Sequence, residues 1–370
     1  PPFRLPRELV AREIDQIRAL GVEIRCGVAV PDAASLQRLA DEADAVVLAA
    51  GTTEPQRPEL PGVNAVGVLH GLDFLRAANV GKAGPIGRRV VVIGGGFTAV
   101  DCARTARRLG AELVGMYYRR TVGDMYITPG EVEEMAHEGI RFEVQCSPVA
   151  VVEAEGRVRA VRFVRTRPGP PEADGRRSFA PVPGSEFEVE ADMVLLGTGQ
   201  RPATDWLPEP RPANLVLTGD VAAGARSLID AIADGRRCAR ELDTRLMGAE
   251  RWRIAVEVAP AAGTGRTRDL DALPRQAMPV RPVAERGPAV EVETGYPEEI
   301  ARTEAKRCYL CHYKFEIDNE LCIYCDRCLK VKPVEGCIVK VRELTYDAAG
   351  RITGYHRSNG AKDYNLLYID

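Results

Sequence analysis

A glycine-rich stretch that follows a short apolar run constrains the fold of this chain more than any other feature. Residues 89–93 read RVVVI, a β-branched run typical of a buried strand, and GGGFTAVDCARTARRLGA follows at once. The spacing of Ala and Leu predicts a helix that ends near Gly110, and a second apolar run covers 113–118. A glycine-rich turn between a strand and a helix, with a second strand at the expected distance, predicts a βαβ unit that binds a dinucleotide.

Each small residue of this turn has a separate physical role. Gly94, Gly96 and Ala99 stand in a G-x-G-x-x-A frame. Gly94 permits a tight turn, Gly96 lets a pyrophosphate approach the backbone, and Ala99 lets the helix pack close to the strand. The helix N-terminus then faces the phosphates with its unpaired N–H groups. The alternative is a glycine-rich turn that connects strand and helix but holds no ligand.

The end of the second predicted strand favours NADP over NAD. A site for NAD usually carries Asp or Glu about 20 residues past the glycines, where it accepts hydrogen bonds from the ribose hydroxyls. Here the strand ends GMYYRR, with no carboxylate from Gly115 to Arg120. Guanidinium groups bind a ribose 2′-phosphate through charge-assisted hydrogen bonds, which makes Arg119 and Arg120 candidates for this contact. The alternative is that both arginines are solvated or pair with acids such as Asp124.

The overall composition excludes several other classes of protein. The chain has 370 residues, is 45% hydrophobic and 28% charged, and carries a formal net charge of −3. These values fit a protein of two or three domains with hydrophobic cores, and they give no electrostatic basis for binding nucleic acid. The sequence has no apolar run that reaches the roughly 18 residues predictive of a membrane span.

Six of the ten cysteines cluster near the end of the sequence. Three of them are spaced as Cys322-x-x-Cys325-x-x-Cys328, the first part of a bacterial ferredoxin motif whose thiolates ligate a [4Fe–4S] cluster. Zinc is the main alternative, with Cys308 and Cys311 as one ligand pair and the first two of these cysteines as the other. Zinc leaves Cys328 without a role, because a tetrahedral site closes with four ligands. A disulfide framework is a third alternative.

The fourth ligand departs from the ferredoxin pattern. Lys332 occupies the position where that pattern has a cysteine, and Cys337 follows five residues later. Cys337 either takes the fourth position after a longer loop or ligates a neighbouring cluster, for which Cys308 and Cys311 are further candidates. The final LLYID weakly echoes the FEID before the motif, which would place the start of a second motif beyond the last residue.

The other four cysteines, Cys26, Cys102, Cys146 and Cys238, stand alone in the sequence. Isolated cysteines usually behave as small buried hydrophobic side chains, and we expect that of each of them. Their separation also disfavours a disulfide reductase of the thioredoxin-reductase type, since that chemistry needs a CxxC pair inside the nucleotide domain.

Two strand–turn segments flank the dinucleotide unit and look like halves of a further domain. In the first, a predicted strand from Ala45 to Ala49 runs into Gly51. In the second, NLVLTGD, a strand ends at Gly219-Asp220 and a helix follows. A short acidic turn that opens a helix can hold a ribityl and pyrophosphate chain, because the carboxylate accepts hydroxyl hydrogen bonds and the helix N-terminus faces phosphate. Either segment could instead be an ordinary strand–turn–helix connection.

Together these stretches resemble one family, the small subunit of bacterial glutamate synthase and its relatives, which are FAD-dependent NADPH oxidoreductases that work with iron–sulfur clusters. The resemblance runs from residue 1 to about 247 and is carried by PFRLPRELV, LAAGTTEPQRPELPG, GGGFTAVDCARTARRLGA, YYRRTVGDM, GTGQRP and TGDVAAGARSLIDAIADGRR. A further stretch, ERGPAVEVETGYPEEIARTEAKRCYLC, resembles the family's cysteine-bearing linker. The chain departs from the family at two positions. Phe97 stands where the family usually has Asn, and Tyr126 stands where it usually has Pro.

The resemblance implies an α/β fold of two nested Rossmann-like, three-layer dinucleotide-binding domains and a small α+β ferredoxin-like iron–sulfur domain. The implied ranges are 1–87 and 203–247 for the FAD domain, 88–202 for the inserted NADPH domain, 248–300 for a linker and 301–370 for the iron–sulfur domain. No glycine-rich turn lies between Pro1 and Arg89, whereas the family has its first dinucleotide motif before the segment matching FRLP. We therefore expect a sequence truncated at both ends that holds only the later contacts of a flavin site.

The resemblance also implies the cofactors NADP(H), FAD and a [4Fe–4S] cluster, and a cytoplasmic location. Hydride would pass from NADPH to FAD, and single electrons would then pass through the cluster to another redox subunit or a ferredoxin of a multi-subunit complex. Thr98 would join the glycines at the pyrophosphate, and Gln200 would lie near the nicotinamide. Gly51, Gly219 and Asp220 would face the flavin. Two alternatives remain open. One is electron flow from reduced ferredoxin to NADP, or bifurcation in a larger complex; the other is a non-catalytic wiring subunit that relays electrons through clusters alone.

Replacing Cys325 by Ala tests the cysteine assignment. We expect Cys325→Ala to lose the [4Fe–4S] cluster, because the cluster then lacks one of three closely spaced thiolate ligands. Iron, sulfide and zinc contents of the purified chains measure this, with Cys26→Ala as a matched control that keeps the cluster. Zinc in place of iron and sulfide in the wild-type chain would exclude the assignment.

Overall fold

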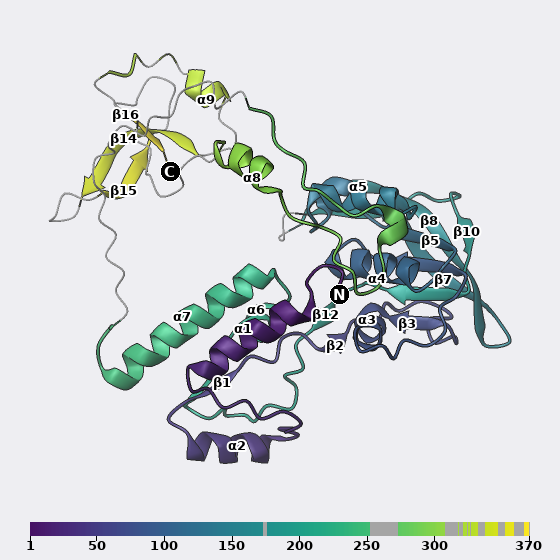
Figure 1. Cartoon of the computed structure of the whole chain (residues 1–370), viewed down its shortest axis with the longest axis horizontal. Helices are drawn as coiled ribbons and strands as arrows, with labels where there is room; N and C mark the ends of the chain where they lie inside the picture. The colour runs from purple at the N-terminus through teal and green to yellow at the C-terminus, as the bar shows by residue number, and fades with distance from the viewer. Residues whose placement is uncertain are drawn as a thin grey trace. The chain divides into compact units, whose positions relative to one another are not determined.

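The computed structural model describes residues 1–172, 176–251 and 273–307, and further stretches at 317, 321–323, 325, 327–331, 337–346, 352–358 and 366–369. The chain divides into two compact units, labelled by element in Figure 1. The first comprises Pro1–Arg253 and Met278–Gly295, and the second comprises Ile254–Ala277 and Tyr296–Asp370. Among the described helices, none combines the length and apolar character needed to cross a bilayer.

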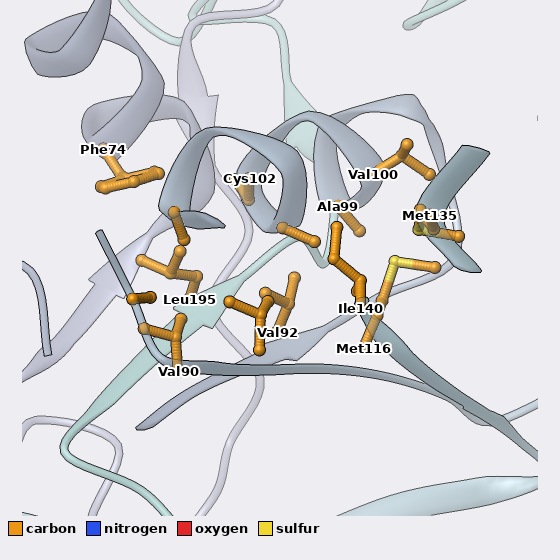
Figure 2. Close-up of a cluster of buried hydrophobic side chains, with 14 of the residues drawn as sticks. Phe74, Val90, Val92, Ala99, Val100, Cys102, Met116, Met135, Ile140 and Leu195 are labelled. Carbon is orange, nitrogen blue, oxygen red and sulfur yellow. The ribbon is translucent and has the colours of Figure 1, made fainter. Parts of the chain in front are cut away.

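A five-stranded parallel sheet forms the centre of the first unit. Its strand order is β3 (Val68–His70), β11 (Met193–Leu196), β4 (Arg89–Ile93), β5 (Leu113–Tyr118) and β6 (Arg141–Val144). The helices packed on one face are α3 (Gly71–Asn79), α4 (Phe97–Arg108) and α5 (Pro129–His137). Because successive side chains of a strand point to opposite faces, Val90 and Val92 pack against these helices, as Figure 2 shows, while Val91 and Ile93 pack on the other face.

An antiparallel sheet covers the other face of the parallel sheet. Its strands are β7 (Cys146–Ala154), β8 (Arg157–Pro171), β9 (Arg177–Pro181) and β10 (Phe187–Glu190), with β8 in the middle. Phe163 of β8 is fully buried, and its ring stacks on Tyr117 of the parallel sheet at a centroid distance of 4.6 Å. The four strands pair with one another, and an isolated parallel bridge joins Arg157 of β8 to Val66. In the chain this sheet is an insertion between β6 and β11, and it covers one side of the nucleotide unit.

The parallel sheet begins earlier in the chain than residue 88, where the sequence places the start of the nucleotide domain. Strand β3 pairs with β11, and helix α3 packs against α4. His70 is fully buried at the junction of β3 and α3. Residues 68–79 therefore belong to the same sheet and helix layer as the glycine-rich turn.

The remaining elements of the first unit come from both sides of the nucleotide unit in sequence. The helices are α1 (Arg7–Ala19), α2 (Ala33–Glu42), α6 (Asp220–Ala223) and α7 (Leu228–Met247). Strand β1 (Val46–Leu48) pairs in parallel with β13 (Leu215–Leu217), and β2 (Glu54–Pro55) pairs antiparallel with β12 (Gln200–Arg201). Segments that flank the nucleotide unit in sequence thus meet in space, so that the sheet of β1 and β13 is interrupted by the nucleotide unit.

A buried network of charges joins three separated segments of the first unit. We call it the arginine–glutamate cluster; its members are Arg4, Arg104, Arg108 and Arg286 together with Asp101, Glu131, Glu134 and Glu138. Glu138, 3% exposed, accepts hydrogen bonds from the guanidinium groups of Arg104 and Arg108 at 2.7 Å. Arg286 reaches the same carboxylate at 2.9 Å. Because Glu138 and these three guanidinium groups are all desolvated, each buried charge needs its oppositely charged partners to offset the cost of its burial.

The cluster ties the chain's first residues and residues 278–295 to α4 and α5. The backbone N–H of Val292 donates to the carbonyl of Phe3 at 3.1 Å, and the guanidinium of Arg108 lies 4.0 Å from the centre of the buried Phe3 ring. A short 3₁₀ helix, η3 (Val283–Glu285), precedes Arg286. This segment lies inside the range 248–300 that the sequence treats as a linker, and its contacts are non-local.

The second unit contains two helices and a three-stranded antiparallel sheet among its described residues. The helices are α8 (Glu298–Ala305) and α9 (Arg327–Val331), and the strands are β14 (Ile338–Tyr346), β15 (Ile352–Arg357) and β16 (Leu366–Ile369). Strand β14 lies in the middle, and its Val341 is fully buried. The carboxylate of Glu304 in α8 accepts a hydrogen bond from the backbone N–H of Gln276 at 3.0 Å. This bond attaches Gln276, which belongs to the second unit, to α8.

Replacing Glu138 by Gln tests the arginine–glutamate cluster. Burial by itself raises the pKa of Glu138, but the hydrogen bonds and charges of Arg108 and Arg104 outweigh it and hold the pKa at about 2. Glu138→Gln leaves buried guanidinium groups uncompensated, so we expect the free energy of unfolding to fall by about 3–5 kcal/mol at pH 7. Chemical denaturation measures this, and Glu133→Gln on the exposed side of α5 should change stability by less than about 0.5 kcal/mol.

The same comparison has a defined pH dependence. A carboxylate whose pKa falls on folding stabilises the protein fully above its unfolded pKa, and this stabilisation is lost as pH falls toward the folded pKa. For Glu138 that window extends from 4.5 down to about 2. The difference between wild type and Glu138→Gln should therefore shrink as pH falls below 4.5, and a constant difference would contradict the assignment.

Candidate functional site

The turn between β4 and α4 lies against a second turn, the one that follows β11. Gly94 has a φ of 150°, and a Cβ atom there would lie 2.3 Å from the carbonyl oxygen of Gly197. A Cβ on Gly197 would in turn lie 2.7 Å from the Cβ of Ala99. Real Cβ atoms do not approach other atoms so closely, so both positions require glycine and position 99 requires a small side chain. Ala99 itself is completely buried.

The next two glycines differ in what surrounds them. A Cβ on Gly95 would lie 2.3 Å from the ring of Tyr118, whose hydroxyl donates to the carbonyl of Asp124 at 2.9 Å. Gly96 is the N-cap of α4, and no atom lies within 4 Å of the position that its Cβ would take. The helix N-terminus is therefore open at Gly96, where its unpaired N–H groups can meet an anion.

These turns form the floor of a cavity of about 400 Å³. Its lining comes from residues 93–96, 117–120 and 197–199, with further side chains including Tyr126 and Arg176. The carboxyl ends of β4, β5 and β11 meet there, at the edge of a parallel sheet where ligands of open α/β folds bind. The cavity thus brings together Gly94, Gly96, Arg119 and Arg120 from the residues predicted by sequence.

The two arginines at the end of β5 have different surroundings. Arg120 is 5% exposed; its Nε donates to the carbonyl of Arg177 at 2.6 Å and its Nη2 to the carboxylate of Glu172 at 2.5 Å. Arg119 is exposed, and its guanidinium lies 4.8 Å from the ring centre of Phe179. None of the described carboxylates forms an ion pair with Arg119. Of the two, Arg119 is the one that presents its charge to the cavity.

The other predicted residues of this site lie around the cavity. Thr98 is half-buried in the first turn of α4, next to the buried Ala99. Gln200 follows the cavity residue Gly199 and pairs with Pro55 in the short strands β12 and β2. Both lie within a few residues of the lining rather than in it.

His70 is a residue that the sequence reasoning missed. Its Nδ1 accepts the backbone N–H of Leu72 at 3.2 Å, so its Nε2 carries the proton and donates to the carbonyl of Gly199 at 3.0 Å. Burial lowers the pKa of His70 below its usual value, which keeps the ring neutral and this pattern intact. The imidazole thereby holds the turn of Gly197 to Gly199 in place. A histidine outside any motif gives no sequence signal for this role.

The predicted flavin contacts lie together at a separate edge. Strands β1 and β13 run in parallel with Leu48 opposite Leu217, so the turns that contain Gly51 and Gly219 leave the same edge. Both glycines have positive φ values, 68° and 69°, with open space where a Cβ would stand. The carboxylate of Asp220 is half-buried and accepts the backbone N–H of Arg226 at 3.3 Å.

The cysteines fall into two groups. Cys102, Cys146 and Cys238 are buried, as predicted, and burial raises the pKa of the Cys146 thiol to about 11. Cys26 is exposed, so the prediction that it is buried is wrong. The residues of its loop before α2, 21–32, are all exposed. Cys325 is exposed and Cys322, Cys328 and Cys337 are half-buried, whereas Cys308 and Cys311 lie outside the described residues. Within the described part, no three His, Cys, Asp or Glu side chains gather closely enough to hold a metal.

A parallel sheet with helices on one face, a glycine-rich βα turn and an open helix N-terminus define a dinucleotide-binding protein of the Rossmann type. Residues 14–222 match the pyridine nucleotide-disulphide oxidoreductase family, and the chain belongs to this family.

Three relatives show how far the similarity extends. The chain is 33% identical over 345 residues to NADP(+)-dependent formate dehydrogenase subunit beta of Moorella thermoacetica, covering 84% of this chain and 48% of the relative. It is 42% identical over 213 residues to NADPH-Fe(3+) oxidoreductase subunit beta of Geobacter sulfurreducens, covering 56% and 32%. It is 33% identical over 274 residues to the glutamate synthase [NADPH] small chain of Escherichia coli, covering 65% and 58%. The chain thus spans less than two thirds of each of these relatives.

A pair of glycine substitutions tests the geometry of the turn. Gly94→Ala places a methyl group 2.3 Å from a backbone oxygen, so we expect a loss of about 1–3 kcal/mol in the free energy of unfolding. Gly96→Ala has open space around it and should keep normal stability but weaken binding of NADPH, because the methyl group stands where a phosphate would approach. Denaturation and nucleotide titration separate the two effects, with Gly84→Ala as a control that changes neither. Equal stability of the Gly94 and Gly96 variants would contradict the close approach.

Proposed function

We propose that this chain is part of an NADPH-dependent flavin oxidoreductase that passes electrons between NADP(H), FAD and [4Fe–4S] clusters to a partner redox protein or subunit. The observation that carries the proposal is the cavity in which the glycine-rich turn, the open N-terminus of α4 and the exposed Arg119 meet. Family membership supports the oxidoreductase class. The names of the three relatives, all of which refer to NADP or NADPH, support the choice of nucleotide.

The cavity residues suit the separate parts of NADPH. The pyrophosphate would lie over Gly94 and Gly96, where the backbone is bare and the helix N-terminus supplies N–H donors. Arg119 would bind the ribose 2′-phosphate, since its guanidinium faces the cavity. The nicotinamide would lie toward Gly199 and Gln200, where the hydrogen bond from His70 to the Gly199 carbonyl holds the turn. Thr98 would complete the pyrophosphate side at the first turn of the helix.

The edge of β1 and β13 fits one part of a flavin. Gly51 and Gly219 leave open backbone there, and Asp220 offers a carboxylate that can accept hydrogen bonds from hydroxyl groups. A bound flavin supplies the step from two-electron to one-electron transfer. The protein's own residues would bind and orient the two cofactors, and none of them needs to act as an acid or base. The nested FAD and NADPH domains of the glutamate synthase small-subunit family remain the expected arrangement.

The cysteines would hold the iron–sulfur part of the chain. Cys322, Cys325 and Cys328 have the spacing of a cubane site, and Cys337 precedes the strand β14. We infer that residues 301–370 form this ferredoxin-like domain, with Cys308 and Cys311 as further ligands. Another redox subunit of a larger complex would then be the partner, since two of the relatives are named as beta subunits and the third as a small chain.

Replacing Arg119 by Ala tests the nucleotide assignment. A charge-assisted hydrogen bond is worth about 1.5–3 kcal/mol, so Arg119→Ala should weaken NADPH binding about ten- to a hundredfold. Binding of NADH, which has no 2′-phosphate, should change less than about twofold. Fluorescence titration of each reduced nucleotide measures this on the purified chain without any need for a second cofactor. A wild-type chain that binds NADH as well as NADPH would refute the proposed nucleotide.

A further inference from the structure

The end of β5 is tied to the antiparallel sheet by a set of hydrogen bonds. The hydroxyl of Thr166 in β8 donates to the carbonyl of Arg119 at 2.7 Å. The backbone N–H of Gln145 donates to the carbonyl of Arg120 at 3.1 Å, and the carbonyl of Gln145 accepts the N–H of Thr166 at 2.8 Å. Thr166 is 5% exposed, so little water competes for these bonds. The backbone from which the Arg119 side chain projects is therefore held in place.

The side chain of Arg119 lies over an aromatic ring of the same antiparallel sheet. Strands β8 and β9 pair antiparallel and form the β8–β9 hairpin, in which Phe179 of β9 stands opposite Pro168 of β8. The guanidinium carbon of Arg119 lies 4.8 Å from the centre of the Phe179 ring. The guanidinium carbon of Arg120 lies 5.8 Å from the same centre. Phe179 thus lies beside both arginines that follow β5.

Core packing does not account for the aromatic residue at position 179. Phe179 is half-buried, and the clusters of buried side chains on the two faces of the parallel sheet, as far as the structure describes them, do not contain it. The ring of Phe187, by contrast, packs against the second of these clusters and stacks on Phe163. The contacts with the two guanidinium groups are therefore the feature that sets Phe179 apart.

Stacking restrains the Arg119 guanidinium but leaves its N–H groups available. A guanidinium attracted to an aromatic face lies over the ring, and its donors point outward in its own plane. Arg119 lines the cavity, and none of the described carboxylates forms an ion pair with it. An arginine loses rotamer freedom when it binds an anion, so a side chain already held on a ring binds at a lower entropic cost.

The two arginines differ in how their charges are offset. Arg120 pairs with Glu172 and donates to the Arg177 carbonyl. The pKa of Arg119 is lowered, first by partial burial and then by the nearby charge of Arg120, so its surroundings disfavour its positive charge. A bound dianion would offset this cost. A ring that holds Arg119 at the cavity keeps its charge where such an anion can reach it.

We propose that Phe179 is a positioning residue that sets the preference for NADP(H), because its ring holds the Arg119 guanidinium where it binds the 2′-phosphate. The proposal rests on the proposed function and deepens it. Phe179 is not among the residues that the structure describes around the cavity, so it acts through Arg119 and not by touching the nucleotide. The preference then depends on two sheets, with the cation at the end of β5 and its aromatic support in β9.

Binding of two adenosine fragments tests the proposal. The probes are 2′,5′-ADP, which has the 2′-phosphate, and 5′-AMP, which lacks it; isothermal calorimetry on the purified chain measures both. Phe179→Leu keeps an apolar side chain but removes the aromatic face, so it should weaken 2′,5′-ADP about two- to fivefold, the effect of losing a cation–π contact at a partly exposed site. The affinity for 5′-AMP should stay the same. Phe179→Tyr keeps the aromatic face and should bind both fragments like the wild type.

A similar pair elsewhere in the same sheet supplies the matched control. The guanidinium carbon of Arg165 lies 4.4 Å from the ring centre of Phe187, and the described lining of the cavity includes neither residue. Phe187→Leu also removes a ring beneath an arginine, and it should leave both affinities unchanged. If Phe187→Leu weakens 2′,5′-ADP as much as Phe179→Leu does, the effect belongs to the sheet as a whole and the positioning role is overturned.

A double-mutant cycle shows whether Phe179 acts through Arg119. In the Arg119→Ala background, Phe179→Leu should have little further effect on 2′,5′-ADP, because the side chain that the ring holds is already gone. The same loss of affinity with and without Arg119 would overturn the positioning role. Thermal unfolding of each variant shows whether a loss of fold accounts for the result.

The outcomes separate this proposal from the function on which it rests. If Phe179→Leu binds 2′,5′-ADP as tightly as the wild type, while the wild type still prefers 2′,5′-ADP over 5′-AMP, the assignment of Phe179 is overturned and NADP remains the nucleotide. If the wild type binds both fragments equally or binds neither, the choice of NADP fails, and the role of Phe179 fails with it.

Discussion

The close approach of two backbone turns, those at Gly94 and Gly197, is the constraint on which the candidate site depends. The two turns and Ala99 leave no room for a Cβ at either glycine. The carboxyl ends of β4 and β11 can therefore lie next to one another, and the floor of the cavity consists of backbone rather than side chains. Backbone N–H groups become accessible to a ligand only in such a place, because a side chain would otherwise cover them.

Helix α4 is held on both sides, which keeps this close approach fixed. Its Ala99, labelled in Figure 2, and its Ala103 belong to the apolar cluster that includes Val90 and Val92 of the sheet. Its Arg104 and Arg108 belong to the arginine–glutamate cluster. Buried ion pairs contribute little net stability compared with apolar packing, but they are specific in geometry, since each charge needs its partner. We infer that the cluster fixes where α4, the chain's first residues and residues 278–295 meet, and that the apolar core supplies most of the stability.

The sequence allowed the local part of this structure to be predicted and left the non-local part undetermined. Residues 89–93 and 113–118 form strands as their apolar runs indicate, and α4 ends at Arg108, two residues before Gly110. These signals are local: an apolar run, a helical period and a glycine. The pairing of β3 with β11 and the burial of Arg286 depend on partners far along the chain, and neither leaves a periodic signal in its own segment. The lack of a regular pattern, together with the family resemblance, is why 248–300 was predicted to be a linker.

The site shows the same division in finer detail. From the sequence alone, two adjacent arginines at a strand end are equivalent. In the structure Arg120 donates hydrogen bonds to Glu172 and to the Arg177 carbonyl, whereas Arg119 faces the cavity. His70 reaches Gly199 only because β3 pairs with β11. Sequence spacing can thus locate the turn, while the division of roles among the residues around it follows from which strands become neighbours.

Charge crowding at the mouth of the cavity gives a physical reason for this division. Of the arginines that line the cavity, Arg120 forms an ion pair with Glu172, whereas none of the described carboxylates forms an ion pair with Arg119. Asp124, whose pKa is held at about 2 chiefly by its hydrogen bond with the Thr121 side chain and by the Arg177 backbone N–H, is engaged with the hairpin. Like charges held close together in a partly desolvated site reduce stability, and a fold retains such a cost mainly where a ligand offsets it. In the function proposed, a 2′-phosphate at Arg119 would supply the negative charge that none of the described carboxylates supplies there, so that nucleotide binding would stabilise the carboxyl end of β5.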